Sequence, residues 1–170
     1  MRKLVLGLSV SIVALAMVGT VASLAAGRDD DDDEFEARLS GFREVPAVST
    51  VASGRFRAEL DEDEQVLRYR LRFEDLEAPV LFSHIHFGQK VVNGGVSAFL
   101  CGGGNKPPCP QEGTVTGTVT PADVIGPSNQ GIAAGEFAEL VRAMRAGVTY
   151  ANVHSEKFPG GEIRGQIEED

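Results

Sequence analysis

The three histidines of the chain lie in two short segments that are typical of β-strands. His84 and His86 stand in LFSHIHFG, and His154 stands in YANVHSEKFPGGEIRGQ. Successive side chains of a strand point to opposite faces, so the His-x-His pair shares one face. Neutral imidazole is the commonest protein ligand for copper and zinc. The chemistry that this pattern indicates is metal binding, provided that His154 reaches the same place.

The position of the third histidine depends on how the two strands pair. In the second segment Tyr150, Asn152 and His154 share one face, and in the first Ile85 points the other way, toward the expected core. If the two strands lie side by side, the three imidazoles meet on the outer face of the sheet.

Two interpretations of this cluster stay open. In the first, the histidines bind one copper or zinc ion, with a water in the fourth position. The Irving–Williams order favours copper(II), and binding through neutral imidazoles should weaken as the pH falls through about 6–7. In the second, the imidazoles form hydrogen bonds that fix the sheet face, with partners such as Asn152, Ser155 or Glu162.

The segment PGGEIRGQ that follows His154 predicts a tight turn and then a strand. Glu162, Arg164 and Gln166 share one face of that strand, and Ile163 and Ile167 share the other. Glu162 and Arg164 either orient the imidazoles or form surface hydrogen bonds, and a structural role is favoured for both.

Short strand-like runs broken by Gly and Pro must position these residues. The run at 65–76 alternates most clearly, with apolar side chains on one face and Arg68, Arg70 and Arg72 on the other, a stripe that we interpret as a solvated surface. One helix is expected near 135–146, where apolar residues recur at helical spacing. The pattern predicts an all-β fold, an antiparallel Greek-key-like β-sandwich or flattened barrel of about eight strands with one short helix in a connection. The expected strands are 35–41, 51–61, 65–76, 80–88, 96–101, 113–120, 148–155 and 161–169.

The N-terminal residues predict export. Arg2 and Lys3 precede an apolar run and then small residues, so we expect residues 1–26 to be a signal peptide, with a retained anchor as the alternative. We expect residues 27–34 to be an acidic, disordered linker and residues 35–168 to form one domain. No second apolar stretch is long enough to span a membrane. The expected location is secreted or periplasmic.

Charge and cysteines restrict the function further. The formal net charge of −9 argues against a general nucleic-acid binder, which needs a basic face. Cys101 and Cys109 enclose CGGGNKPPC, and in an exported protein this spacing predicts a disulfide that shapes a loop.

Four segments together resemble the CHRD (chordin-type) domain family: ARLSGFREVPAVSTVASGRF, HIHFG, VVNGGV and YANVHSEKFPGGEIRGQ. The resemblance covers roughly Phe35 to Ile167 and is closest to the single-domain exported microbial type. It implies a β-sandwich binding module with an unidentified protein or cell-envelope partner. The growth-factor antagonism of chordin is not carried over, because that activity is attributed largely to cysteine-rich modules that this chain lacks.

A fainter resemblance concerns the copper–zinc superoxide dismutases, which also carry an HxH on an outer strand and a late Gly-rich turn before an arginine. Three histidines are too few for two metals. The alternative function is therefore an extracytoplasmic protein that binds one copper or zinc ion through His84, His86 and His154, and no enzymatic activity is predicted.

Overall fold

The computed structural model describes residues 33–63 and 65–170, and this part of the chain is all-β. Its eight strands pair antiparallel, and one α-helix stands among the connections, so the predicted architecture is confirmed. The elements are β1 (Glu34–Ser40), β2 (Ser53–Asp61), β3 (Val66–Glu74), β4 (Val80–Phe87), β5 (Gly95–Cys101), β6 (Gly113–Val119), α1 (Phe137–Arg145), β7 (Thr149–Ser155) and β8 (Ile163–Glu169). Three short 3-10 helices lie in the connections at Gly41–Arg43, Pro121–Asp123 and Ser128–Gln130.

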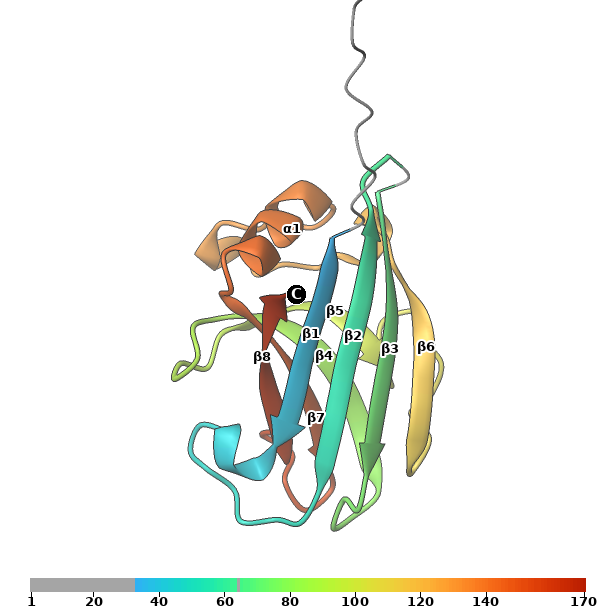
Figure 1. Cartoon of the computed structure of the whole chain (residues 1–170), viewed down its shortest axis with the longest axis vertical. Coiled ribbons are helices and arrows are strands. Elements are labelled where there is room, and N and C mark those ends of the chain that lie inside the picture. The colour runs from blue at the N-terminus through green and yellow to red at the C-terminus, as the bar shows by residue number, and fades with distance from the viewer. Residues whose placement is uncertain (1–32, 64) are drawn as a thin grey trace, which may run out of the picture. The chain divides into compact units, whose positions relative to one another are not determined.

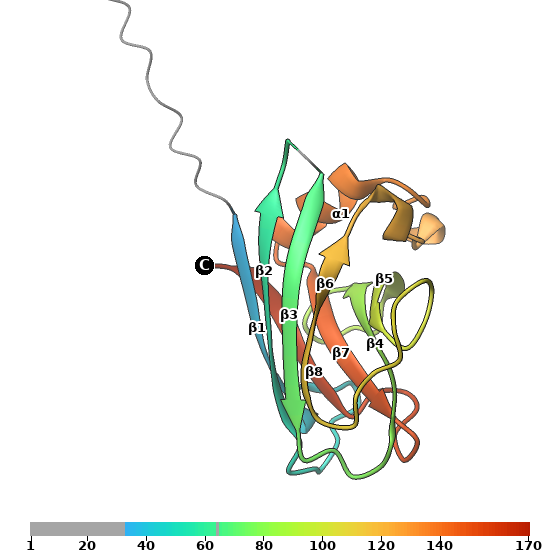
Figure 2. The same ribbon diagram turned by 90° about the vertical axis from the view of Figure 1, so that its right-hand side faces the viewer.

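The strands form one curved sheet in the order β5-β4-β7-β8-β1-β2-β3-β6. The sheet curls until its edge strands β5 and β6 approach each other, which gives a nearly closed barrel (Figures 1 and 2). The Tyr69 hydroxyl of β3 donates a hydrogen bond to the Leu100 carbonyl of β5 at 2.6 Å, and so links the two halves across the interior. Neighbours such as β3 and β6, or β4 and β7, are far apart in sequence, as a Greek-key-like fold requires.

The core follows directly from the alternation of apolar and polar side chains. In β3, Leu67, Tyr69, Leu71 and Phe73 point inward and are buried, while the arginines between them point outward. The expected inward residues of the other strands, among them Ile85, Val153 and Ile163, are fully buried as well. Each large apolar side chain of this kind contributes about 1.5–3 kcal/mol on burial.

The helix α1 lies across one end of the barrel (Figure 1). Its apolar side chains Phe137, Leu140, Val141 and Met144 are buried against that end. The helix stops before Gly147, whose positive φ of 64° is a conformation that glycine adopts without penalty. The amphipathic pattern therefore predicted both the helix and its buried face.

Other predictions concern the two cysteines, the N-terminal residues and membrane-spanning helices. Cys101 and Cys109 lie at disulfide distance with Cα atoms 5.0 Å apart, as predicted. The predicted signal peptide and most of the predicted linker lie outside the described residues, and β1 already begins at Glu34, the last linker residue. Among the residues that the structure describes, no helix has the length and apolar character needed to span a membrane.

Candidate metal centre

Pairing of β4 with β7 brings the three histidines together. The register places His84 opposite Asn152, His86 opposite Tyr150, and Phe82 opposite His154. Each histidine offers one ring nitrogen to a cluster in which these atoms lie within 4.8 Å of one another. The geometric condition set by the sequence pattern is therefore met.

The three histidines share one sheet face, as expected, but other residues cover that face, so it is not an open surface. His84, His86 and His154 are only 5, 8 and 6% exposed. The Phe99 ring lies 4.4 Å from the His84 ring between centroids, and the Phe82 ring lies 4.8 Å from His84 and 4.7 Å from His154. These aromatic rings, together with loops 88–94 and 156–161, shield the imidazoles from water.

Backbone carbonyls set the protonation of two of the rings. The Nδ1 of His86 lies 3.0 Å from the Gly94 carbonyl oxygen, and the Nδ1 of His154 lies 2.9 Å from the Pro159 carbonyl oxygen. A carbonyl oxygen only accepts, so both Nδ1 atoms carry the proton and both Nε2 atoms present a lone pair. Among the described residues, the buried Nε2 of His86 has no hydrogen-bond partner.

The third ring completes a compact set of nitrogens. The Nδ1 of His84 lies 3.2 Å from the Nε2 of His154. In the metal-free protein His84 donates this hydrogen bond, because the His154 nitrogen has no proton to give. Two nitrogens bound at 2.0–2.1 Å to one tetrahedral ion lie about 3.3–3.4 Å apart. The observed separation thus fits two ligands of one ion with little movement.

The environment keeps all three imidazoles neutral. Burial, followed by repulsion from His154 and His86, lowers the pKa of His84 to about 3. Burial also lowers the pKa of His86 to about 4, although the hydrogen bond to Gly94 opposes this shift. The pKa of His154 is lowered by burial too. Proton competition for the ligand nitrogens is therefore expected at more acidic pH than the 6–7 that the sequence suggested.

Arg164 supports the centre without touching the histidines. Its guanidinium lies 3.3 Å from the centroid of the Tyr150 ring, and that ring stacks in parallel on His86 at 4.7 Å. The same guanidinium holds loop 88–94, which carries the Gly94 carbonyl, by donating hydrogen bonds to Gln89 O, Val92 O and Asn93 Oδ1. Arg164 is 1% exposed, so the surface hydrogen bonds favoured from the sequence are wrong. It instead positions the Tyr150 ring and loop 88–94, both of which contact His86.

Glu162 has the equivalent role on the other side of the cluster. It is fully buried and accepts hydrogen bonds from Thr50 Oγ1 at 2.9 Å, from the Glu77 backbone N–H at 2.9 Å and from the Ser155 hydroxyl. The Ser155 hydroxyl in turn accepts a hydrogen bond from the Phe158 N–H. Glu162 therefore fixes the turn that carries the Pro159 carbonyl, and it too is no surface residue.

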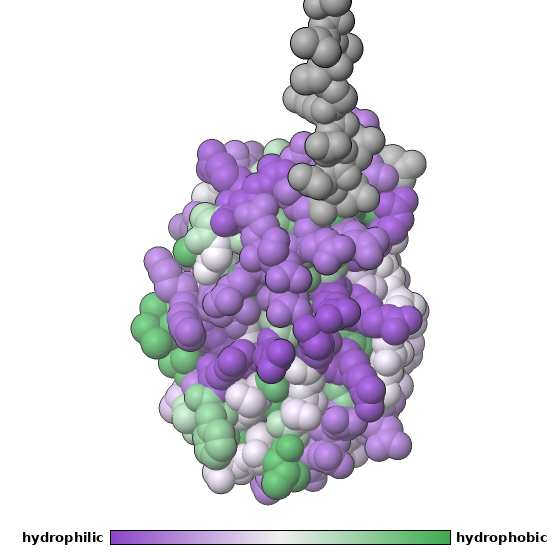
Figure 3. Space-filling view, viewed as in Figure 1, coloured by the Kyte–Doolittle hydropathy of each residue, from purple (hydrophilic) through white to green (hydrophobic). Residues whose placement is uncertain are grey.

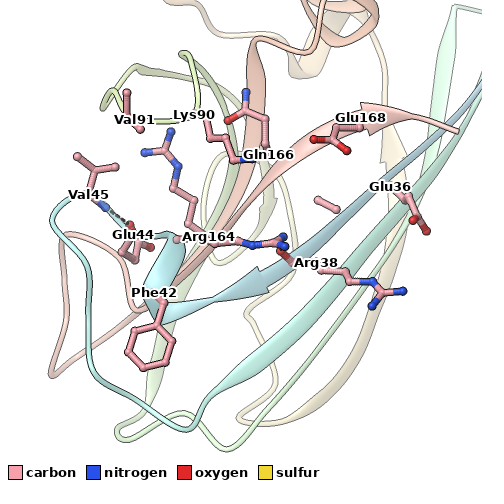
Figure 4. A pocket seen from close by; sticks show the side chains of 12 residues that line it. Glu36, Arg38, Phe42, Glu44, Val45, Lys90, Val91, Arg164, Gln166 and Glu168 are labelled. Atoms are coloured by element: carbon pink, nitrogen blue, oxygen red, sulfur yellow. Dashed lines mark hydrogen bonds between the residues drawn. The ribbon is translucent and has the colours of Figure 1, made fainter.

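A hollow of about 350 Å³ opens beside Arg164 on the outer side of β1 and β8 (Figure 4). Glu44 lies in its wall and receives a hydrogen bond from the Asn152 amide. Burial raises the pKa of Glu44 to about 7, against the hydrogen bond from Val45 and the positive charge of Arg164. Sequence reasoning missed Glu44, because nothing in its local pattern shows that loop 41–52 will be folded against β7 and β8.

Comparison with known proteins gives one match. A family model described as the CHRD domain matches residues 35–167, which is most of the chain and nearly the whole of the described barrel. No curated protein and no solved structure matches the chain significantly.

Proposed function

The chain belongs to the CHRD domain family, and from that premise we propose that it is an exported barrel domain that binds one copper ion. The ligands in this proposal are the Nε2 atoms of His86 and His154 and the Nδ1 atom of His84. The observation that carries it is the meeting of three neutral, buried imidazoles whose ring nitrogens lie within 4.8 Å.

The unpartnered nitrogen of His86 favours a ligand over a purely structural network. A buried acceptor without a hydrogen-bond partner destabilises the fold by about 1–3 kcal/mol. If the imidazoles served only to hydrogen-bond the sheet face, this nitrogen should have a partner. A metal ion that accepts this lone pair removes the cost. The Nε2 of His154 also presents a lone pair to the cluster, at 3.2 Å from the Nδ1 of His84.

The surrounding residues would hold such an ion by orienting its ligands. The Gly94 and Pro159 carbonyls fix the tautomers of His86 and His154, as backbone acceptors commonly do for metal-bound histidines. Phe82 and Phe99 exclude water from the cluster. His84 would bind such an ion through Nδ1 as the tautomer that carries its proton on Nε2. Copper(II) is preferred to zinc by the Irving–Williams order at nitrogen ligands.

Calorimetric titration with copper(II) tests this function on the mature chain. We expect one ion per chain, and at least about 100-fold weaker binding in His86→Phe, which keeps an aromatic ring against Tyr150 but removes the nitrogen. A variant with Asp29–Asp33 changed to Asn controls for binding to the acidic run and should bind as the wild type does. Equal binding by wild type and His86→Phe, or no binding by either, would overturn the proposal.

Export is part of the proposal and has a separate basis. It rests on the sequence of residues 1–26 and is consistent with the Cys101–Cys109 disulfide, because disulfides persist in oxidising compartments. N-terminal sequencing of the protein recovered outside the cytoplasm should give a first residue between about Ala25 and Arg28. An intact Met1 in that material would contradict export with cleavage. The role as an interaction module, with a protein or envelope partner, also remains a proposal and is compatible with metal binding.

A further inference from the structure

Arginine side chains gather on the outer face of β1, β2 and β3, on the half of the barrel that does not carry the histidines. Pairing places Arg55 directly opposite Arg72 and Arg57 directly opposite Arg70, and Arg38 lies beside Arg55 on β1. We call these five residues the arginine face. Figure 3 views this side of the barrel, where strongly hydrophilic side chains spread over the strands.

The charges on this face are incompletely neutralised. Glu36 pairs with Arg55 at 2.5 Å and with Arg57 at 3.8 Å, and Glu74 pairs with Arg72 at 3.0 Å. Within the described residues, Arg38 and Arg70 form no ion pair. Five guanidinium groups thus meet three carboxylates, those of Glu36, Glu74 and Glu168, which lies opposite Glu36 on β8.

This arrangement is unfavourable for the isolated barrel. Like charges directly opposite each other on neighbouring strands are destabilising, and here two such pairs are adjacent. The side chains are not diverted into the protein, since Arg57 and Arg72 are 61% and 66% exposed. An excess of aligned positive charge in an acidic protein indicates a face that meets an anion.

The neighbouring side chains favour a sugar polymer. Exposed Thr116 and Thr114 of β6 lie opposite Arg70 and Arg72 and offer hydroxyl groups next to the charges. Arg38, Arg55 and Arg72 follow one another across three strands at about 4.8 Å per strand, a step comparable to one sugar unit. Guanidinium groups pair with carboxylates through two parallel hydrogen bonds.

We propose that the arginine face binds a linear acidic polysaccharide that carries carboxylates along its chain. Carboxylates pair with the arginines, and sugar hydroxyls donate to or accept from the threonines. A nucleic acid fits less well, because its densely charged phosphates would extend past the arginines to Glu34 and Glu59 in the next row of the sheet and be repelled there. The polysaccharide site shares no residue with the histidine cluster, so a failure of one proposal leaves the other unaffected.

The probe is polygalacturonate, with neutral dextran and double-stranded DNA as comparisons, in binding assays at low and high salt. The test variant is Arg57→Gln/Arg70→Gln, and Arg55→Gln/Arg72→Gln is a second one that removes the adjacent pair. The matched control is Arg142→Gln, an exposed arginine of α1 that pairs with Glu139. Circular dichroism checks that every variant is folded.

We expect polygalacturonate binding that weakens about tenfold in each double variant, is unchanged in Arg142→Gln, and is lost at high salt. Dextran should not bind. Absence of polygalacturonate binding, or equal binding by wild type and both double variants, would overturn the proposal. Tighter binding of DNA than of polygalacturonate would overturn it as well, because the face would then recognise phosphate charge rather than a carboxylated sugar.

Discussion

The two halves of the barrel share one strand pattern but have opposite outer faces. On β4 and β7 the outward side chains His84, His86 and His154 are buried, neutral and close together. On β2 and β3 the outward arginines are charged and largely in solvent. Loops 88–94 and 156–161 fold back over the first half and supply the carbonyls that orient its rings. Strand alternation thus decides which side chains face outward, and the loops decide whether that face becomes a surface or an enclosed site.

Acidification should give the largest effect, because it should lower the free energy of unfolding through the histidine half of the barrel. The pKa of each histidine is lower in the folded chain than the unperturbed value near 6.5, so the unfolded state binds more protons below that pH. The free energy of unfolding of the metal-free protein should therefore be intact above about pH 6.5 and fall toward pH 4, by up to about 1.4 kcal/mol per pH unit for each histidine. Urea denaturation across this range measures it.

The matched comparison for the pH profile is His86→Phe, which removes one of the three titrating rings. Between about pH 6.5, the unfolded-state pKa of histidine, and about pH 4, the free energy of unfolding of this variant should fall less steeply than that of the wild type. The expected difference in slope is about 1.4 kcal/mol per pH unit. Identical slopes in the two proteins would mean that the buried ring of His86 does not resist protonation.

Replacing one arginine in each half gives the next largest contrast. Arg164→Gln removes a buried cation that packs on Tyr150 and holds loop 88–94, so the free energy of unfolding should fall by about 3 kcal/mol. Arg70→Gln on the open half should change it by less than about 0.5 kcal/mol. Chemical denaturation at neutral pH compares the two, and a similar loss in both variants would contradict the difference between the halves.

The same contrast explains what could be predicted from the sequence. Alternation in 65–76 and 80–88 was enough to assign strands and inward residues such as Leu71 and Ile85, because each depends on its immediate neighbours. The common face of His84 and His86 followed in the same way. The enclosure of the site did not, since it depends on contacts such as that of Arg164 with loop 88–94, more than seventy residues away in the chain.

Glu44 provides a smaller test at the boundary between the halves. Burial raises its pKa to about 7, so the stability associated with its protonated form is present below about pH 4.3 and is lost as the pH rises through 7. Glu44→Gln keeps an oxygen for Asn152 without the charge. It should raise the free energy of unfolding by about 1–3 kcal/mol near pH 8 and have little effect near pH 4. An equal effect at both values would show that ionisation of Glu44 is not the cause.

The position of bound copper tests the central claim most directly. Crystals of the copper-loaded mature chain, measured at the copper absorption edge, locate the ion by its anomalous signal. We predict one peak enclosed by His84, His86 and His154, with about 2.0–2.1 Å to the Nε2 atoms of His86 and His154 and the Nδ1 atom of His84. A peak only at the acidic residues before β1, or at any place that leaves these three nitrogens without a metal, would contradict the account.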